Sequence, residues 1–283
     1  MISLTRVLAH LPLVMAHAIG AVLGIAMLLT APRVRRMIAA NLSRAGLDSR
    51  ALRWRVALHI GRGVIEIPAI WLRSDAAIGR LVRDISGAEI VAQARAGGHG
   101  VIFMTPHLGC FELAGQWLGR DHPMTNLYRP PKLAWLEPPM VLGRKRGKVM
   151  LATTDISGVR KLLRALRAKQ AIGLLPDQVP GSGEGEWAEF FSSPAYTMTL
   201  ATRLAESSGA PIIFAFAERL SWGRGYHLHF SQMPQRLPDE SSVRHLNRAV
   251  EALIRTRPEQ YLWSYNRFKR PAGAPAPNQK RFD

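Results

Sequence analysis

The stretch VIFMTPHLGCFE, residues 101–112, decides the fold of this chain. Its first four residues are apolar and follow the glycine-rich turn GGHG, residues 97–100, which is typical of a buried strand. Apolar residues at helical spacing follow over residues 111–118 and predict a helix packed against a sheet. We therefore expect His107 at a strand-to-helix junction, where active sites of open α/β sheets tend to lie.

The pair His107 and Glu112 has a spacing with a chemical interpretation. Within one ideal helix, residues five apart point roughly 140° away from each other. If His107 precedes the helix and Glu112 lies on its first turns, the carboxylate can reach the imidazole and hold its tautomer. The other ring nitrogen would then be free to take a proton from a substrate hydroxyl, as in acyl transfer to an alcohol. Taken alone, such a pair is more often a helix-capping His and a surface Glu.

Polar residues follow two further apolar runs. Residues 123–128 and 171–175 are predicted strands; Arg129 follows the first, and Asp177 and Gln178 follow the second. Because parallel strands end at one edge of a sheet, we expect Arg129 and Asp177 in one cleft near His107. An Arg in this position could bind a phosphate or face an oxyanion.

The remaining periodicities complete an α/β class, with a central, mostly parallel or mixed sheet flanked by helices. Strands are predicted at 211–217 and 226–230. Helices are predicted at 51–72, where Asp48 could cap and Pro68 should kink or shorten the helix, and at 156–170, 197–208 and 239–257. We expect three regions: an N-terminal segment over 1–31, a main domain over 32–271, and a disordered tail rich in Pro over 272–283.

The N-terminal segment is long and apolar. From Val7 to Ala31 there is no Asp, Glu, Lys or Arg, which is enough for a helix that enters a bilayer. A signal peptide or a buried core helix would pass the same test. We favour a membrane anchor, because arginines follow it at once and place the main domain on the cytoplasmic face by the positive-inside rule.

The charge of the chain limits its partners. It carries 38 Lys and Arg against 20 Asp and Glu, a net charge of +18. Such a surface favours polyanions: nucleic acid, anionic lipid or an acidic carrier protein. The single cysteine, Cys110, excludes an internal disulfide and a four-cysteine zinc site. The histidines show no HExxH or comparable ligand pair, so we expect no metal and no cofactor.

Taken in order, these features resemble the bacterial lipid A late acyltransferases, the lauroyl and myristoyl transferases within the glycerolipid acyltransferase superfamily. The resemblance covers nearly the whole chain. It rests on the apolar N-terminus, Asn41-Leu42, His107-x4-Glu112, Tyr128-Arg129-Pro130, Leu175-Pro176-Asp177-Gln178, Phe190-Phe191 with Pro194, Tyr261-Leu262-Trp263, and Arg267-Phe268-Lys269. The chain departs from the family pattern at Ser192, where a glycine is usual, and at Tyr265-Asn266, where His or Arg is frequent.

The resemblance implies a catalytic pair of His107 and Glu112 in a membrane-bound O-acyltransferase of the bacterial inner membrane. The donor would be an acyl thioester on acyl carrier protein or coenzyme A, and the acceptor a phosphorylated lipid A precursor. Arg129 would face the oxyanion, and Asp177 and Gln178 would shape the site or bind the acceptor. A lysophospholipid or a glycosylated phospholipid is an alternative acceptor.

Two other classes of protein are consistent with parts of the sequence. A non-catalytic nucleic-acid-binding protein would explain the charge, but the chain shows no nucleic-acid-binding motif and has an apolar N-terminus, so we expect no nucleic acid partner. A hydrolase could use Cys110 as its nucleophile. A cysteine in such an apolar stretch is more often a small buried side chain.

Overall fold

A seven-stranded sheet forms the centre of the computed structural model, which describes residues 2–131 and 133–277. Its strand order is β1-β9-β8-β2-β5-β3-β4. The strands are β1 (Val82–Ser86), β2 (Val101–Met104), β3 (Met124–Tyr128), β4 (Val149–Thr153), β5 (Ala171–Leu174), β8 (Ile212–Arg219) and β9 (Tyr226–Gln232).

Every pairing in this sheet is parallel except that of β8 with β9. The prediction of a mostly parallel or mixed α/β sheet is therefore confirmed. Strand β2 is central, between β5 and β8, and its four residues are all buried. A strand covered on both faces needs apolar side chains at every position, which explains the continuous run VIFM.

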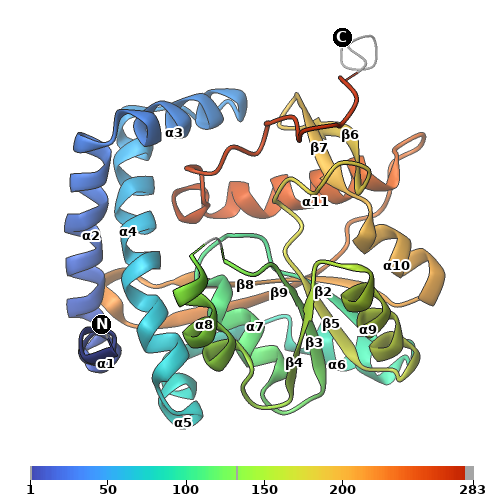
Figure 1. Ribbon diagram of the computed structural model, residues 1–283, viewed down its shortest axis with the longest axis horizontal. Helices are drawn as coiled ribbons and strands as arrows, with labels where there is room; N and C mark the ends of the chain where they lie inside the picture. Colours follow the sequence, from blue (N-terminus) through green and yellow to red (C-terminus); the bar gives the residue numbers. More distant parts are fainter. Residues whose placement is uncertain (1, 132, 278–283) are drawn as a thin grey trace.

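Helices cover both faces of the sheet. On one face, Ile102 and Met104 of β2 pack in a cluster with residues of α9 (Ile156–Arg167) and α11 (Ser242–Thr256). On the other face, Val101 and Phe103 pack with α6 (Ala88–Ala96) and α7 (Phe111–Gly119). The alternation follows from the two-residue period of a strand. Figure 1 also shows α8 (Glu137–Arg144), which follows the short turn η1 (Ala134–Leu136), α10 (Leu200–Ser208) and α5 (Asp75–Gly79).

The N-terminal helices form a layer at one side of the sheet (Figure 1). The apolar run does not form one helix: α1 (Ile2–His10) ends before Pro12, and α2 (Leu13–Thr30) follows it. Helix α2 lies along α4 (Arg50–Leu72), and a Cβ at Gly24 would meet the carbonyl oxygen of Ala57 at 1.9 Å, so the two backbones touch. Between them in sequence lies α3 (Pro32–Arg44).

Helix α4 differs from the prediction in two details. It runs through Pro68 to Leu72, and its N-cap is Ser49, whose side chain accepts the N–H of Leu52. Asp48 instead pairs with Arg53. Ser and Asp are about equally good N-cap residues, so Ser49 caps the helix because it is the residue that directly precedes the first turn.

The strands that were not predicted from sequence are β1, β4 and the two strands of an antiparallel hairpin, β6 (Gly185–Phe190) and β7 (Ser193–Met198). After α11 and the short η3 (Pro258–Gln260), the chain returns over this hairpin. The indole N–H of Trp187 donates to the carbonyl of Pro275 at 2.8 Å, and Ala274 is buried. The predicted disordered tail is thus in contact with the domain at Ala274 and Pro275; residues 278–283 lie outside the described residues.

Candidate active site

His107 lies in a turn at the carboxyl end of β2, held by backbone hydrogen bonds on both sides. Its carbonyl accepts the N–H of Leu262 at 3.1 Å, and the N–H of Gly109 donates to the carbonyl of Gln260 at 3.1 Å. Gly109 has φ of +60°, and a Cβ there would lie 2.1 Å from the carbonyl oxygen of Ala217. Only glycine meets both demands, which explains the Gly in the quoted stretch.

A buried arginine supports the same turn from below. Arg219 donates from Nη2 to the carbonyl of Gly109 at 2.8 Å and forms an ion pair with Glu66 of α4 at 2.6 Å. The hydroxyl of Tyr226 and the imidazole of His17 also bond the Glu66 carboxylate. This buried network links helix α2, helix α4 and the turn that carries His107.

Asp177 is the partner of His107. It follows β5, the strand next to β2, and its Oδ1 accepts from His107 Nδ1 at 2.9 Å while its Oδ2 accepts the backbone N–H of His107 at 2.9 Å. Burial tends to raise the pKa of Asp177, but the imidazole and these hydrogen bonds outweigh it and keep that pKa below its usual range. The carboxylate therefore stays ionised and fixes the Nδ1–H tautomer of His107.

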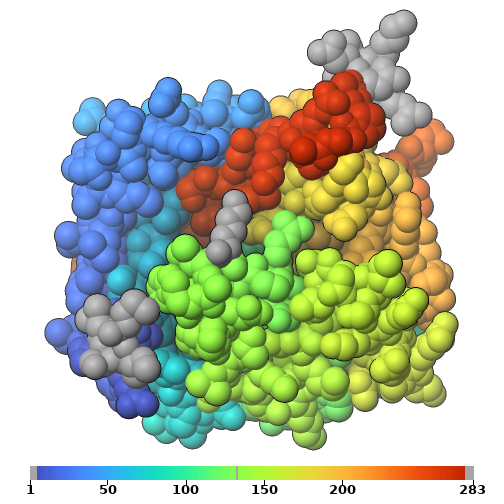
Figure 2. Space-filling model, viewed as in Figure 1, coloured from blue at the N-terminus to red at the C-terminus, as the bar shows by residue number. Residues whose placement is uncertain are grey.

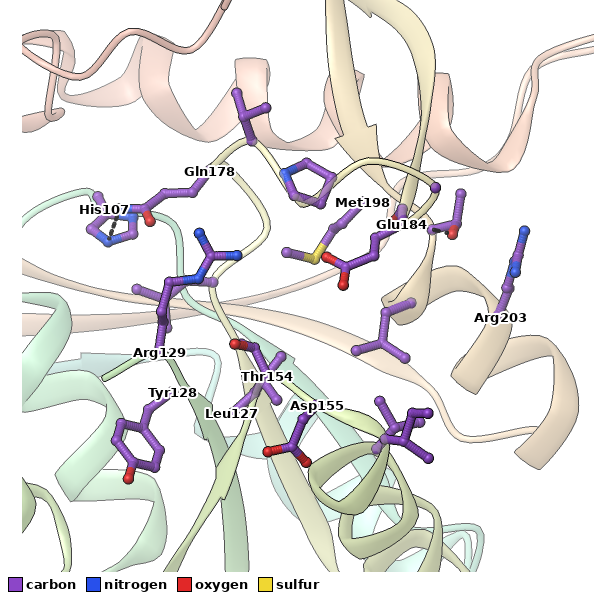
Figure 3. A pocket seen from close by; sticks show the side chains of 18 of the residues that line it. His107, Leu127, Tyr128, Arg129, Thr154, Asp155, Gln178, Glu184, Met198 and Arg203 are labelled. Atoms are coloured by element: carbon purple, nitrogen blue, oxygen red, sulfur yellow. Dashed lines mark hydrogen bonds between the residues drawn. The ribbon is translucent and has the colours of Figure 1, made fainter. Parts of the chain in front are cut away.

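The second ring nitrogen of His107 faces Gln178. The side-chain Nε2 of Gln178 lies 3.0 Å from His107 Nε2, which is an acceptor in this tautomer (Figure 3). Both groups line one cavity. A substrate hydroxyl that displaces the Gln178 amide would reach a nitrogen able to take its proton.

Glu112 does not make the contact with His107 that its spacing suggested. Its carboxylate accepts from Nε of Arg144 at 3.1 and 3.0 Å, also pairs with Nη2 of that residue, and accepts the indole N–H of Trp71 at 3.0 Å. Glu112 lies on the first turn of α7 and is buried, facing α4 and α8. Its visible effect is to hold the Arg144 guanidinium in place at the cavity.

The cavity has a volume of about 710 Å³, within the range of about 300–1,000 Å³ that is usual for small-molecule sites. Figure 3 shows His107 and Gln178 at one end and Glu184, Met198 and Arg203 at the other, with the Arg129 guanidinium pointing in between. Apolar side chains line much of the wall: Leu127, Met140, Ile156, Val159, Leu175, Val179, Met198 and Leu200.

The candidate residues therefore converge as the strand-end argument predicted. His107, Arg129 and Gln178 line one cavity, and Asp177 bonds His107 from beneath it. Arg144 also lines the cavity and was missed as a site residue. In the sequence it is the first residue of the basic run RKRGK, residues 144–148, in which nothing distinguishes it from a solvated neighbour.

Comparison with known proteins decides the family. Residues 1–270 match the family model of the bacterial lipid A biosynthesis acyltransferases. The chain belongs to this family. It is 30% identical over 227 residues to the lipid A biosynthesis lauroyltransferase of Escherichia coli K12, covering 77% of this chain and 72% of the relative. It is 29% identical over 219 residues to the palmitoleoyltransferase of the same organism, covering 76% and 70%, and 29% identical to a lipid A biosynthesis acyltransferase of Haemophilus influenzae, covering 74% and 68%.

Membership confirms the resemblance stated from sequence, and with it the reaction class: this lipid A acyltransferase is an O-acyltransferase. Its Cys110 fits poorly with a nucleophile. The side chain is 2% exposed, and burial raises the pKa of the thiol well above its ordinary value. A thiolate, which is the reactive form, is thereby disfavoured.

One cluster of metal-ligand type occurs in the described part of this lipid A acyltransferase. Glu218, His227 and His229 offer ligand atoms within 4.8 Å of one another across β8 and β9. Glu218 is already engaged, with Arg257 on one oxygen and His229 on the other. None of the three residues lines the cavity of His107. Because alternate residues of a strand share a face, the spacing of His227 and His229 could have predicted from sequence that they lie side by side.

Proposed function

We propose that this enzyme transfers a fatty acyl chain from an acyl thioester to a hydroxyl of a phosphorylated lipid A precursor, with His107 as the general base. The observation that carries the proposal is the His107–Asp177 pair at one end of a largely apolar cavity. Acyl transfer to an alcohol needs a base for the hydroxyl, room for a hydrocarbon chain and a positive group for the developing negative charge.

Nε2 of His107 takes the proton from the acceptor hydroxyl, and the alkoxide oxygen attacks the thioester carbonyl carbon. The carbonyl becomes an oxyanion, which Arg129 or Arg144 of the cavity wall would stabilise. Collapse of this tetrahedral intermediate forms the ester and breaks the carbon–sulfur bond. The thiolate leaves with the proton from the imidazolium, so His107 returns to its starting state.

Glu112 enters this mechanism through Arg144. Glu112 fixes the Arg144 guanidinium at the cavity. A guanidinium is planar and can donate two hydrogen bonds at once to an oxyanion or to a phosphate of the acceptor. Asp177, rather than Glu112, orients the imidazole. Gln178 holds Nε2 until the acceptor hydroxyl takes its place.

The acceptor is a membrane lipid, so we place the enzyme at the bacterial inner membrane with the main domain on the cytoplasmic face. Helix α2 is the one helix among the described residues that is long and apolar enough to cross a membrane, by length and composition. Exposed arginines follow it on α3, at positions 33, 35 and 36. These cations would meet anionic headgroups on the cytoplasmic side.

We favour acyl carrier protein over coenzyme A as the donor, because the chain has a net charge of +18 and the carrier is an acidic protein. Helix α9, beside the cavity, exposes Arg160, Lys161, Arg164 and Arg167 on its outer side. A carrier bound there would present its thioester arm to the cavity from α9.

The test is an acyl transfer assay with the purified full-length enzyme. Each donor, as the carrier-protein thioester and as the coenzyme A thioester, is offered with a lipid A precursor, a lysophospholipid or a glycosylated phospholipid, and products are weighed by mass spectrometry. We expect ester formation on the lipid A precursor, faster from the carrier protein. Absence of product on the precursor, or equal product with His107→Ala, would refute the proposal.

A further inference from the structure

The segment between β3 and β4 exposes an unusual set of large apolar side chains. Leu133, Trp135 and Leu142, on and beside η1 and α8, are 54%, 55% and 67% exposed. Single exposed apolar residues are normal on a soluble surface, but three within ten positions form a patch. We call these three residues the α8 patch. A tryptophan among them is typical of a membrane–water interface.

Helix α8 has two faces, and the other one belongs to the active site. Met140 and Arg144, four positions apart, line the cavity of His107. Leu142, two positions from each of them, points roughly 200° away, to the opposite side of the helix, given 3.6 residues per turn. Trp135 lies just before the helix, on η1. The wall of the cavity is therefore one helix thick here, with acyl-binding space inside and exposed apolar side chains outside.

The charges around the α8 patch favour an anionic surface. Lys145 and Lys148, which follow the patch in sequence, are exposed. The acidic residue within the segment, Glu137, accepts a hydrogen bond from the hydroxyl of Tyr128 at 3.3 Å, in the cavity wall. In a bilayer leaflet, apolar side chains can enter the acyl region while neighbouring cations contact the lipid phosphates. The α8 patch and the cations beside it have this combination.

The helix that carries the α8 patch packs against the N-terminal helices. Helix α8 packs on α4, where the backbone of Gly143 lies against the ring of Trp71, and α4 packs on α2. Figure 1 shows α2, α4 and α8 side by side, and Figure 2 shows the same order over the surface from blue through cyan to green. Val22 of α2 and Val64 of α4 are 65% and 60% exposed. Exposed apolar side chains thus occur on all three helices, more widely than one anchor helix requires.

We propose that the α8 patch is a second membrane contact, which sets the mouth of the cavity against the bilayer so that the lipid acceptor reaches His107 without leaving the leaflet. This rests on the proposed function for the nature of the acceptor. The occupant is an anionic lipid surface; a second copy of the chain and a soluble acidic protein are the occupants that the test excludes.

The test places a spin label at single positions of the full-length enzyme, by Leu142→Cys and Trp135→Cys. Leu237→Cys is the matched control, because Leu237 is 53% exposed but lies after β9, outside the three helices. The native Cys110 is buried and should resist labelling. Collision with oxygen, which concentrates in lipid, and with a water-soluble nickel complex is measured with and without vesicles of phosphatidylethanolamine and phosphatidylglycerol.

We expect labels at 142 and 135 to gain oxygen contact and lose nickel contact on vesicles, while the label at 237 stays in water. Labels at 142 and 135 that remain in water on sedimented vesicles would overturn the inference, leaving α2 as the membrane contact. Labels immobilised without vesicles, in a dimer or with added acyl carrier protein, would overturn it in favour of a protein occupant.

A functional variant separates this inference from the proposed function. Leu142→Glu should raise KM several-fold for acceptor embedded in vesicles, with kcat little changed, and should leave transfer to acceptor dispersed in detergent nearly unaltered. Equal kinetics of variant and wild type on vesicles would contradict the inference alone. If labels at 142 and 135 enter the bilayer but no acyl transfer occurs in either format, the proposed function fails instead.

Discussion

Asp177 holds His107 at two points, through the imidazole Nδ1 at 2.9 Å and through the backbone N–H at 2.9 Å. One carboxylate therefore fixes both the position of the turn and the tautomer of the ring. The side chains are 10% and 2% exposed, so little water competes for these bonds. Such a carboxylate orients a base and stabilises the imidazolium without taking the proton itself.

The first prediction concerns this pair. His107→Ala should lower kcat roughly 10²–10⁴-fold, the usual contribution of general-base catalysis, in a protein that still folds. Asp177→Asn should cost at least as much as Asp177→Ala, because an amide N–H facing Nδ1 would reverse the tautomer and put the proton on Nε2. Losses in the double variant should not add. The measurement is kcat in the acyl transfer assay, with circular dichroism as the folding control; normal turnover in folded His107→Ala would contradict the mechanism.

The second prediction separates two partners for Glu112. If Glu112 acts by holding Arg144, the effects of Glu112→Gln and Arg144→Gln on kcat/KM should overlap strongly in the double variant, because residues in contact couple. Glu112→Gln combined with Asp177→Asn should come closer to additive. The opposite pattern, with Glu112 coupled to Asp177 and independent of Arg144, would restore the contact that the spacing of His107 and Glu112 suggested.

The sequence predicted correctly which residues lie together, because one rule about parallel sheets was sufficient. His107, Arg129 and Asp177 each follow an apolar run, and the ends of adjacent parallel strands share an edge. The sequence did not predict which of these side chains form hydrogen bonds or ion pairs with each other. The direction of Glu112 depends on the path of the turn before α7, which long-range contacts of Gly109 with Ala217 and Gln260 determine.

The missed hairpin has a local cause. Phe191 and Ser192 connect β6 to β7 with φ of +48° and +56°. A two-residue turn with both φ positive is normally signalled by Asn-Gly or Gly-Gly. Phe and Ser carry no such signal. The sequence around them therefore predicted only a segment that leads into the helix at 197–208. The reversed direction of β9 was equally hidden, because a strand's apolar pattern does not show which way it pairs.

The third prediction concerns the thiol of Cys110. Cys110→Ala should keep most of the acyl transfer activity, and thiol reagents should inactivate the wild type slowly, since the side chain is buried and its raised pKa disfavours the thiolate. The comparison is the inactivation rate of native enzyme against enzyme in mild denaturant, where exposure should speed the reaction. Complete loss of turnover in a folded Cys110→Ala protein would revive the hydrolase hypothesis.

The last prediction concerns the stability of the buried network around Glu66. Burial tends to raise the pKa of Glu66, but Arg219 and the hydrogen bonds of its partners outweigh it and lower that pKa to about 2, from an ordinary value of 4.5. A lowered pKa means that the folded state favours the ionised form. The stabilisation is thus fully present above about pH 4.5 and is lost as the pH falls toward about 2.

Glu66→Gln should therefore lower the free energy of unfolding at neutral pH by about 3–5 kcal/mol, because it leaves Arg219 buried with its charge uncompensated. The difference in free energy of unfolding between variant and wild type should become smaller as the pH falls below about 4.5, because the stabilisation by the ionised Glu66 carboxylate is then lost from the wild type. Asp48→Asn is the control: its ion pair with Arg53 is partly exposed, and removing it should cost only about 0–1 kcal/mol. Denaturant unfolding in detergent, followed by circular dichroism across this pH range, provides both curves. A gap for Glu66→Gln that stayed constant with pH would show that the carboxyl is not the titrating group, and the network would then owe its stability to packing.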